Sequence, residues 1–202
     1  MTAPAAPDRD QKDDAAIDRG RPADAGQRDR NVFVDLDTAL LAIHQGRRGI
    51  ELGLQADIAD GLDRLSDVAD RTVVLVDPPP SEGRHGRETE HRLEVLRDGI
   101  GPLVDRLILV ACPHGEDRSC TCAKPDSGLI EVAAQQHELS LRGGWYIGAD
   151  QAGVVAGRQA GLRTIRIGPA GEDHLSAVHR PDYEARDLLD AANHIMLEEL
   201  AS

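Results

Sequence analysis

The sequence has few aromatic residues, only three cysteines, a deficit of basic charge and no long apolar run. Its 202 residues carry a formal net charge of −13, which argues against a nucleic-acid partner because phosphate backbones are bound by basic surfaces. No apolar run approaches the ~20 residues that a transmembrane helix needs, and the N-terminus lacks the basic-then-apolar pattern of a secretory signal. We therefore expect a cytoplasmic protein with no nucleic-acid or membrane partner, while none of these patterns indicates an oligomeric state.

Composition divides the chain into a tail and one domain. Residues 1–30 mix Ala, Pro, Gly, Asp and Arg with almost no large apolar side chain. Such a segment cannot bury enough surface to offset its chain entropy, so we expect a disordered tail. Residues 31–202 are long enough to form one domain with a full hydrophobic core.

Short apolar runs alternate with segments of helical spacing along this domain. The expected strands are residues 32–35, 72–76, 107–111, 145–147 and 164–167, and the expected helices are residues 58–68, 93–103, 128–137, 154–160 and 182–200. This alternation predicts an α/β fold, a Rossmann-like parallel sheet of about five strands with helices on both faces. Because no long insertion follows the first strand, we expect no large cap domain.

All three cysteines fall within eleven residues, and a histidine lies among them. Cys112, His114, Cys120 and Cys122 have the spacing Cys-x-His, five residues, Cys-x-Cys. Four such ligands complete a tetrahedral zinc site and leave no position for water, which favours a structural zinc loop over a catalytic zinc. The alternative is three chance thiols beside a surface histidine. Thiols that serve as metal ligands also suit a reducing compartment.

Polar residues collect just after the expected strands. The first strand ends in Asp35 and Asp37, and Asp77, the zinc loop with Lys124, and Asp150 follow later strands. Alternate residues of an extended chain face the same side, so two aspartates at this spacing can share one site. One carboxylate can attack phosphorus while the other transfers protons, although an Asp at a strand end also serves as an ordinary turn or cap residue. In a parallel sheet these residues meet at the carboxyl edge, where ligands bind.

The loop that contains these cysteines resembles the zinc loop of the D,D-heptose 1,7-bisphosphate phosphatases, which belong to the haloacid dehalogenase superfamily. The resemblance is carried by Cys-Pro-His, a polar insert, Cys-x-Cys, Lys-Pro and Gly-Leu-Ile, in that order. Histidinol-phosphate phosphatases have a similar loop. The resemblance covers roughly residues 32–168. It implies that Asp35 is the nucleophile, that Asp37 is the general acid/base, and that Lys124 neutralises the charge of the nucleophile and the phosphoryl group. The family's phosphate-binding Thr or Ser after the second strand is absent at Val76-Asp77, and the family arginine before Lys124 is Ala123.

The family's magnesium motif is altered as well. In the family this motif is Gly-Asp-x-x-x-Asp, followed by Ala-Gly-x-x-Ala-Gly, and its two aspartates bind the metal. The first part of the motif corresponds here to Gly148-Ala149-Asp150-Gln-Ala-Gly153, so Ala149 and Gly153 replace both aspartates. Asp150 either turns toward the metal with Asp35 and Asp37 or caps the following helix, and the cap is the favoured reading. The Gly-Thr that follows the two aspartates in the family is Thr38-Ala39.

The sequence is compatible with two functions. The first is a magnesium-dependent phosphatase that hydrolyses a small phosphomonoester, such as the sugar phosphate D-glycero-D-manno-heptose 1,7-bisphosphate, through an aspartyl-phosphate. The second is a catalytically impaired homologue that binds a phosphorylated ligand or a protein partner. A zinc hydrolase is disfavoured because four protein ligands would saturate the metal.

Overall fold

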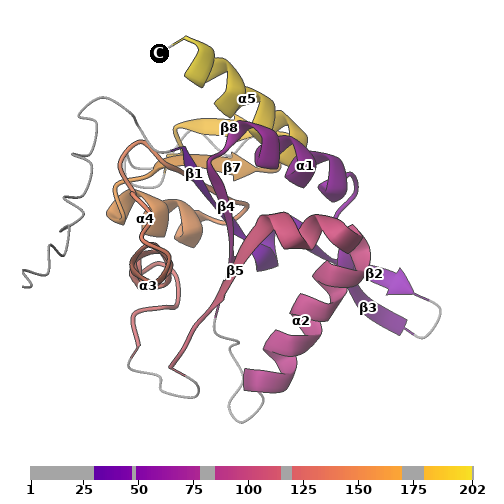
Figure 1. The fold of residues 1–202 in the computed structure, drawn as a ribbon. Coiled ribbons are helices and arrows are strands. Elements are labelled where there is room, and N and C mark those ends of the chain that lie inside the picture. Colours follow the sequence, from indigo (N-terminus) through magenta and orange to yellow (C-terminus); the bar gives the residue numbers. More distant parts are fainter. Residues whose placement is uncertain (1–29, 47–48, 78–84, 115–119, 170–179, 202) are drawn as a thin grey trace, which may run out of the picture.

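A computed structural model of the chain describes residues 30–46, 49–77, 85–114, 120–169 and 180–201 (Figure 1). The expected disordered tail therefore lies almost wholly outside the described residues. Within the described parts of the chain, no helix combines the length and apolar character needed to cross a bilayer.

Six parallel strands form the central sheet, in the order β5-β4-β1-β6-β7-β8. Their bounds are β1 Asn31–Asp35, β4 Arg71–Val76, β5 Leu107–Ala111, β6 Trp145–Gly148, β7 Arg163–Ile167 and β8 Tyr183–Ala185. The chain adds β4 and β5 on one side of β1 and then returns to place β6, β7 and β8 on the other. The carboxyl end of β1 is thus the topological switch point, the usual place for a ligand in such sheets.

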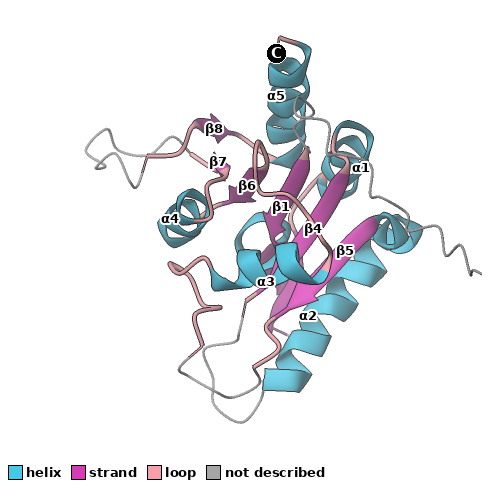
Figure 2. Ribbon diagram, turned by 60° about the vertical axis from the view of Figure 1, so that its left-hand side comes forward, coloured by secondary structure: helices cyan, strands magenta, loops and turns pink. Residues whose placement is uncertain are grey.

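Helices cover both faces of the sheet (Figure 2). Their bounds are α1 Ile58–Val68, α2 His85–Ile100, α3 Gly128–Gln136, α4 Gln151–Gln159 and α5 Leu188–Leu200, with a short 3₁₀ helix, η2, at Gly101–Arg106. One core layer joins α1, α2 and α5 to the side of β1 that carries Val32 and Val34. The other core layer joins α3 and α4 to the opposite face of the sheet, which carries Phe33 of β1 and Tyr146 of β6. The predicted α/β fold with helices on both faces is therefore confirmed.

The structure differs from the sequence-based expectation in several elements. A single turn, η1 (Leu36–Leu40), and an antiparallel hairpin, β2 (Leu41–Gly46) and β3 (Gly49–Leu54), connect β1 to α1. A sixth strand, β8, pairs with the edge of β7. Because β8 takes Tyr183–Ala185, α5 begins at Leu188 rather than at residue 182.

Candidate active site

Asp35 and Asp37 lie at the carboxyl end of the central strand. Asp35 is the last residue of β1, where it pairs in register with Leu75, and only 2% of its side chain is exposed. Asp37 follows in η1, a turn that starts as soon as the strand ends and leaves this second carboxylate half-buried. The expected convergence of the two side chains is present, since their carboxylate oxygens lie within 4.8 Å of each other.

Lys124 reaches this edge from the loop between β5 and α3. Its Nζ contacts Asp35 Oδ2 and lies 3.1 Å from Oδ2 of both Asp77 and Asp150. Burial alone would lower the pKa of Lys124, but the charges of Asp35 and Asp77 more than offset it and raise the pKa above its usual range. The ammonium group therefore stays protonated and offsets part of the negative charge of the acidic cluster.

Asp77 belongs to the same cluster, although the sequence pointed to it only as a polar residue at a strand end. It follows β4, and a narrow cleft is lined by Asp35, Asp77, Lys124 and Tyr146 together. Burial, reinforced by the charge of Asp35, raises the pKa of Asp77 from 3.8 to about 7. This carboxyl group is therefore held partly protonated at neutral pH when no cation besides Lys124 is nearby.

Two further side chains complete the site, and the sequence analysis missed both. Arg92, on α2, donates from Nη1 to Asp37 Oδ2 at 2.6 Å and from Nη2 to the Asp77 carbonyl oxygen at 3.1 Å. Tyr146, on β6, donates from its hydroxyl to Asp35 Oδ2 at 3.0 Å. Burial raises the pKa of Asp37, while Arg92 opposes that shift. No spacing signal distinguishes Arg92 from the other polar residues of its helix, and Tyr146 lies in an apolar run that is typical of core.

Asp150 has the structural role that the sequence favoured. Its Oδ1 accepts a hydrogen bond from the Gly153 N–H at 2.6 Å and so caps the N-terminus of α4. Its other oxygen lies beside Lys124 rather than beside Asp37. The positions of the expected metal aspartates, Ala149 and Gly153, bring no carboxylate to the cluster.

Three carboxylates at this edge can hold a divalent metal ion. Single oxygens of Asp35, Asp37 and Asp77 all lie within 4.8 Å of one another. Hard cations such as Mg²⁺ prefer carboxylate oxygen ligands. The charge balance agrees with this: four carboxylates, including Asp150, face the two cations Lys124 and Arg92, which leaves a formal charge of −2 when all are ionised.

The predicted cysteine and histidine ligands also come together. Cys112, His114, Cys120 and Cys122 offer four ligand atoms that all lie within 4.8 Å of one another. The Cys112 Sγ is 3.7 Å from both the Cys120 Sγ and the His114 Nδ1, and the Cys122 Sγ is 3.3 Å from that Nδ1. A tetrahedron with metal–sulfur bonds of about 2.3 Å and a metal–nitrogen bond of about 2.0 Å has edges of about 3.5–3.8 Å. The cluster therefore has the size and donor set of a closed metal site.

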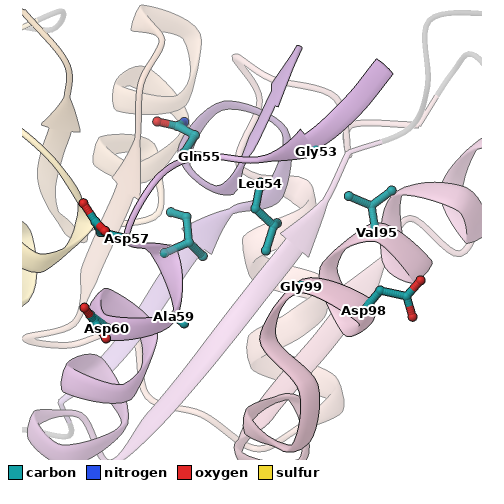
Figure 3. Close-up of a pocket in the computed structure, with 10 residues that line it drawn as sticks. Gly53, Leu54, Gln55, Asp57, Ala59, Asp60, Val95, Asp98 and Gly99 are labelled. Atoms are coloured by element: carbon teal, nitrogen blue, oxygen red, sulfur yellow. The ribbon is translucent and has the colours of Figure 1, made fainter. Parts of the chain in front are cut away.

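A separate cavity of about 680 Å³ lies between the end of β3, the start of α1 and the end of α2 (Figure 3). The charged side chains that line it are Asp57, Asp60 and Asp98. Such a lining repels phosphate, so this cavity does not compete with the carboxyl edge as a phosphate site.

Comparison with known proteins agrees with this geometry. No protein-family model matches the chain. The D-glycero-β-D-manno-heptose-1,7-bisphosphate 7-phosphatase of Pseudomonas putida is 30% identical over 59 residues, which are 29% of this chain and 34% of that enzyme. The chain thus matches about a third of the length of that relative.

Solved structures match over most of the chain. The D,D-heptose 1,7-bisphosphate phosphatase of Bordetella bronchiseptica, solved with magnesium and phosphate, superposes with a TM-score of 0.59 at 17% identity, over 84% of this chain and 99% of that one. A haloacid dehalogenase-like hydrolase of Streptococcus pneumoniae gives a TM-score of 0.53 at 15% identity, over 82% and 97%. The chain therefore has the haloacid dehalogenase fold, and its resemblance to the heptose bisphosphate phosphatases of that superfamily is confirmed.

Proposed function

We propose that the chain hydrolyses a small phosphomonoester through an aspartyl-phosphate on Asp35. The observation that carries this proposal is the meeting of Asp35, Asp37 and Lys124 at the carboxyl end of β1, at the switch point of the sheet. A nucleophilic carboxylate, a proton-transfer group and a fixed positive charge are the protein groups that this chemistry requires.

In the first step an Asp35 oxygen attacks phosphorus and the bond from phosphorus to the ester oxygen breaks. The leaving oxygen takes a proton from Asp37, and the substrate departs as an alcohol. In the second step Asp37 takes a proton from water, whose oxygen attacks the phosphorus of the aspartyl-phosphate. The bond between phosphorus and Asp35 breaks, so inorganic phosphate leaves and both carboxyl groups return to their starting states.

Raising the pKa of Asp37 by burial suits the first step, because a larger share of the group holds the proton that the leaving oxygen needs. Arg92 keeps this carboxyl group in place through the hydrogen bond at 2.6 Å. Lys124 offsets the repulsion between the carboxylate of Asp35 and an approaching phosphate dianion.

Magnesium fits the carboxyl edge through Asp35, Asp37 and Asp77, with Asp77 supplying the carboxylate that Ala149 and Gly153 do not. When bound, it would supply positive charge that offsets the negative charge of the phosphoryl group. Asp150, which the sequence also indicated as a magnesium ligand, remains a cap that contacts Lys124.

A structural zinc ion suits the four ligands Cys112, His114, Cys120 and Cys122. Burial raises the pKa of Cys122 to about 12, so zinc binding would displace a proton from this thiol. A cytoplasmic location is part of the proposal, because thiols that bind a metal ion suit a reducing compartment.

The substrate class follows from the relatives. The matched bacterial enzymes are named for D-glycero-β-D-manno-heptose 1,7-bisphosphate, so a phosphorylated sugar is the class of substrate that we propose. Ala123, which replaces the family arginine, leaves one cation fewer beside the phosphate. We therefore expect weaker binding of a bisphosphate than the relatives would achieve.

The test is hydrolysis of an aryl phosphate and of heptose 1,7-bisphosphate by protein that keeps its zinc-loop metal but is free of Mg²⁺, with and without added Mg²⁺. Turnover that requires Mg²⁺ and is lost in Asp35→Asn supports the proposal. Asp63→Asn, which changes an exposed carboxylate on α1, is the matched control and should keep full activity. Turnover that survives in Asp35→Asn would exclude the aspartyl-phosphate.

A binding protein without turnover is the second candidate. Both Lys124 and Tyr146 contact Asp35 Oδ2, which opposes attack by that oxygen. This candidate replaces the phosphatase if neither the unmodified protein nor its variants show turnover, while inorganic phosphate still raises the melting temperature of the protein with Asp35 intact.

A further inference from the structure

Tyr146 fills the space between the nucleophilic carboxylate and the start of α4. Its side chain is 1% exposed, and its hydroxyl donates to Asp35 Oδ2 at 3.0 Å. Lys124 contacts the same oxygen from the loop before α3. Two protein donors thus converge on one oxygen of Asp35.

Gly153 leaves the room that this phenol occupies. A Cβ at position 153 would overlap the Tyr146 hydroxyl oxygen and would lie 2.9 Å from Cζ. Non-bonded carbon atoms pack at about 3.5–4.0 Å, so no side chain at position 153 can coexist with the phenol where it stands. Gly148 meets the same ring, because its Cβ would lie 2.9 Å from Cε1 of Tyr146.

Position 153 is where the magnesium motif of the resembled phosphatases has its second aspartate. The chain therefore lacks a carboxylate at a position where the phenol leaves no space for one. We propose that Tyr146 is a positioning residue for Asp35 that has exchanged places with a metal-binding carboxylate at position 153. This proposal rests on the proposed function, because it assigns a role to a residue that acts through Asp35.

The exchange has a chemical consequence. A carboxylate accepts hydrogen bonds and binds cations, whereas a tyrosine hydroxyl here donates its proton to Asp35. The side of Asp35 that faces α4 is thus closed to a divalent cation. A cation can still reach Asp35 from its other side, together with Asp37 in η1 and Asp77 after β4.

The experiment is a double-variant cycle at positions 146 and 153. It compares Gly153→Asp, Tyr146→Leu and the double variant Tyr146→Leu/Gly153→Asp, with Tyr146→Leu/Gly153→Asn as the uncharged control of the same shape. Melting temperature and calorimetric Mg²⁺ affinity are measured on protein that keeps its zinc-loop metal, so neither readout depends on turnover.

We expect Gly153→Asp alone to lower the melting temperature by about 5 °C or more, because the added side chain collides with the phenol. In the Tyr146→Leu background the same change should cost much less. The double variant should bind Mg²⁺ about tenfold or more tightly than the Asn control, since a charged carboxylate binds Mg²⁺ more strongly than a neutral amide. If Gly153→Asp does not fold, the double variant and its control still decide the outcome.

Tyr146→Phe tests positioning separately, because it keeps the ring and removes only the hydroxyl. We expect kcat to fall about tenfold with KM changed less than about twofold, the pattern of a group that acts through the nucleophile. The proposal would be overturned if Gly153→Asp lowered the melting temperature equally in the two backgrounds. It would also be overturned by equal Mg²⁺ affinity of the Asp and Asn double variants, or by an unchanged kcat in Tyr146→Phe. Absence of turnover in the unmodified protein would instead overturn the proposed function, and the stability and Mg²⁺ results would still test the exchange.

Discussion

The guanidinium group of Arg92 donates from Nη1 to Asp37 Oδ2 at 2.6 Å and thereby joins helix α2 to the turn after β1. The Arg92 side chain is 9% exposed and that of Asp37 27%, so water screens this ion pair less than an exposed one. The second nitrogen, Nη2, holds the carbonyl oxygen of Asp77. One side chain thus holds both the carboxylate of Asp37 and the backbone of Asp77.

Arg92→Gln should move the alkaline limb of the pH profile of kcat upward by about one unit or more. Burial raises the pKa of Asp37 and Arg92 opposes that shift, so removing the guanidinium raises this pKa further. In the proposed mechanism Asp37 must be protonated to release the leaving group, so the active form should persist to higher pH. Arg92→Lys, which keeps the charge and loses the second hydrogen bond, should shift the limb less. Superimposable profiles for all three proteins would show that Arg92 does not control Asp37.

Lys124→Met should lower the free energy of unfolding at pH 8 by about 3 kcal/mol, because it leaves the buried Asp35 carboxylate without its cation. At pH 5 the loss should be smaller, since Asp77, whose pKa is raised to about 7, is then protonated and repels Asp35 less. Adding Asp35→Asn should recover much of the loss. Urea unfolding at both pH values measures these differences, and Arg97→Met, at an exposed position of α2, is the control. A loss of the same size in the unmodified background and in the Asp35→Asn background would contradict the pairing.

Asp77 should make the metal-free protein less stable as the pH rises from about 4 to about 7. Burial raises the pKa of Asp77 from 3.8 to about 7, so the folded state holds a proton in this range that the unfolded state has lost. The stability that this group contributes is therefore complete below pH 4 and is lost as the pH passes 7. Because water reaches 17% of the side chain, we expect a change of about 2 kcal/mol, below the full value for the shift.

Asp77→Asn, which resembles the protonated form, should flatten that decline. In the presence of Mg²⁺ the unmodified protein should gain more stability at pH 8 than at pH 6, because the proton and the cation compete for Asp77. Chemical unfolding in chelator and in Mg²⁺ across this pH range gives both comparisons. If the free energy of unfolding fell equally steeply with pH in the unmodified protein and in Asp77→Asn, Asp77 would be excluded as the source of the pH dependence.

The sequence predicted the layers of this fold well because its signals there are local. Ile58, Leu62, Leu65 and Val68 recur at helical spacing, and all four are buried in α1, whose bounds they predicted. The hairpin β2–β3 and the three-residue strand β8 were missed. The hairpin lies outside the main sheet, and β8 is held mainly by pairing with β7, a contact between distant parts of the chain that no local pattern reports.

The sequence predicted the site residues that follow strands. It did not predict those that reach the site from the middle of a helix or from within a neighbouring strand. Asp35, Asp37 and Lys124 converge because the carboxyl ends of parallel strands share one edge. Arg92 comes from the middle of α2, and only its packed orientation selects it. Tyr146 has the sequence context of a core residue, and its role depends on a hydroxyl that reaches across to the neighbouring strand.

Cys120→Ser should reduce bound zinc from about one ion per chain to a small fraction and lower the melting temperature. The Cys112 and Cys120 sulfurs lie 3.7 Å apart, so both can bind one ion, and a serine oxygen is a poorer ligand for zinc than a thiolate. Because Cys112 and Cys122 are buried beside the core that holds Leu129 and Ile130, losing the metal should loosen the packing at the start of α3.

The effect should reach the active site, since Lys124 is only two residues from Cys122. We therefore expect chelation of the unmodified protein to reduce phosphate hydrolysis together with zinc content, and added Zn²⁺ to restore both. Metal analysis, thermal unfolding and activity measured on the same samples test this coupling, with His137→Ala, an exposed change beyond α3, as the control. A Cys120→Ser protein that retains its zinc and its melting temperature would show that these four residues do not form a structural metal site.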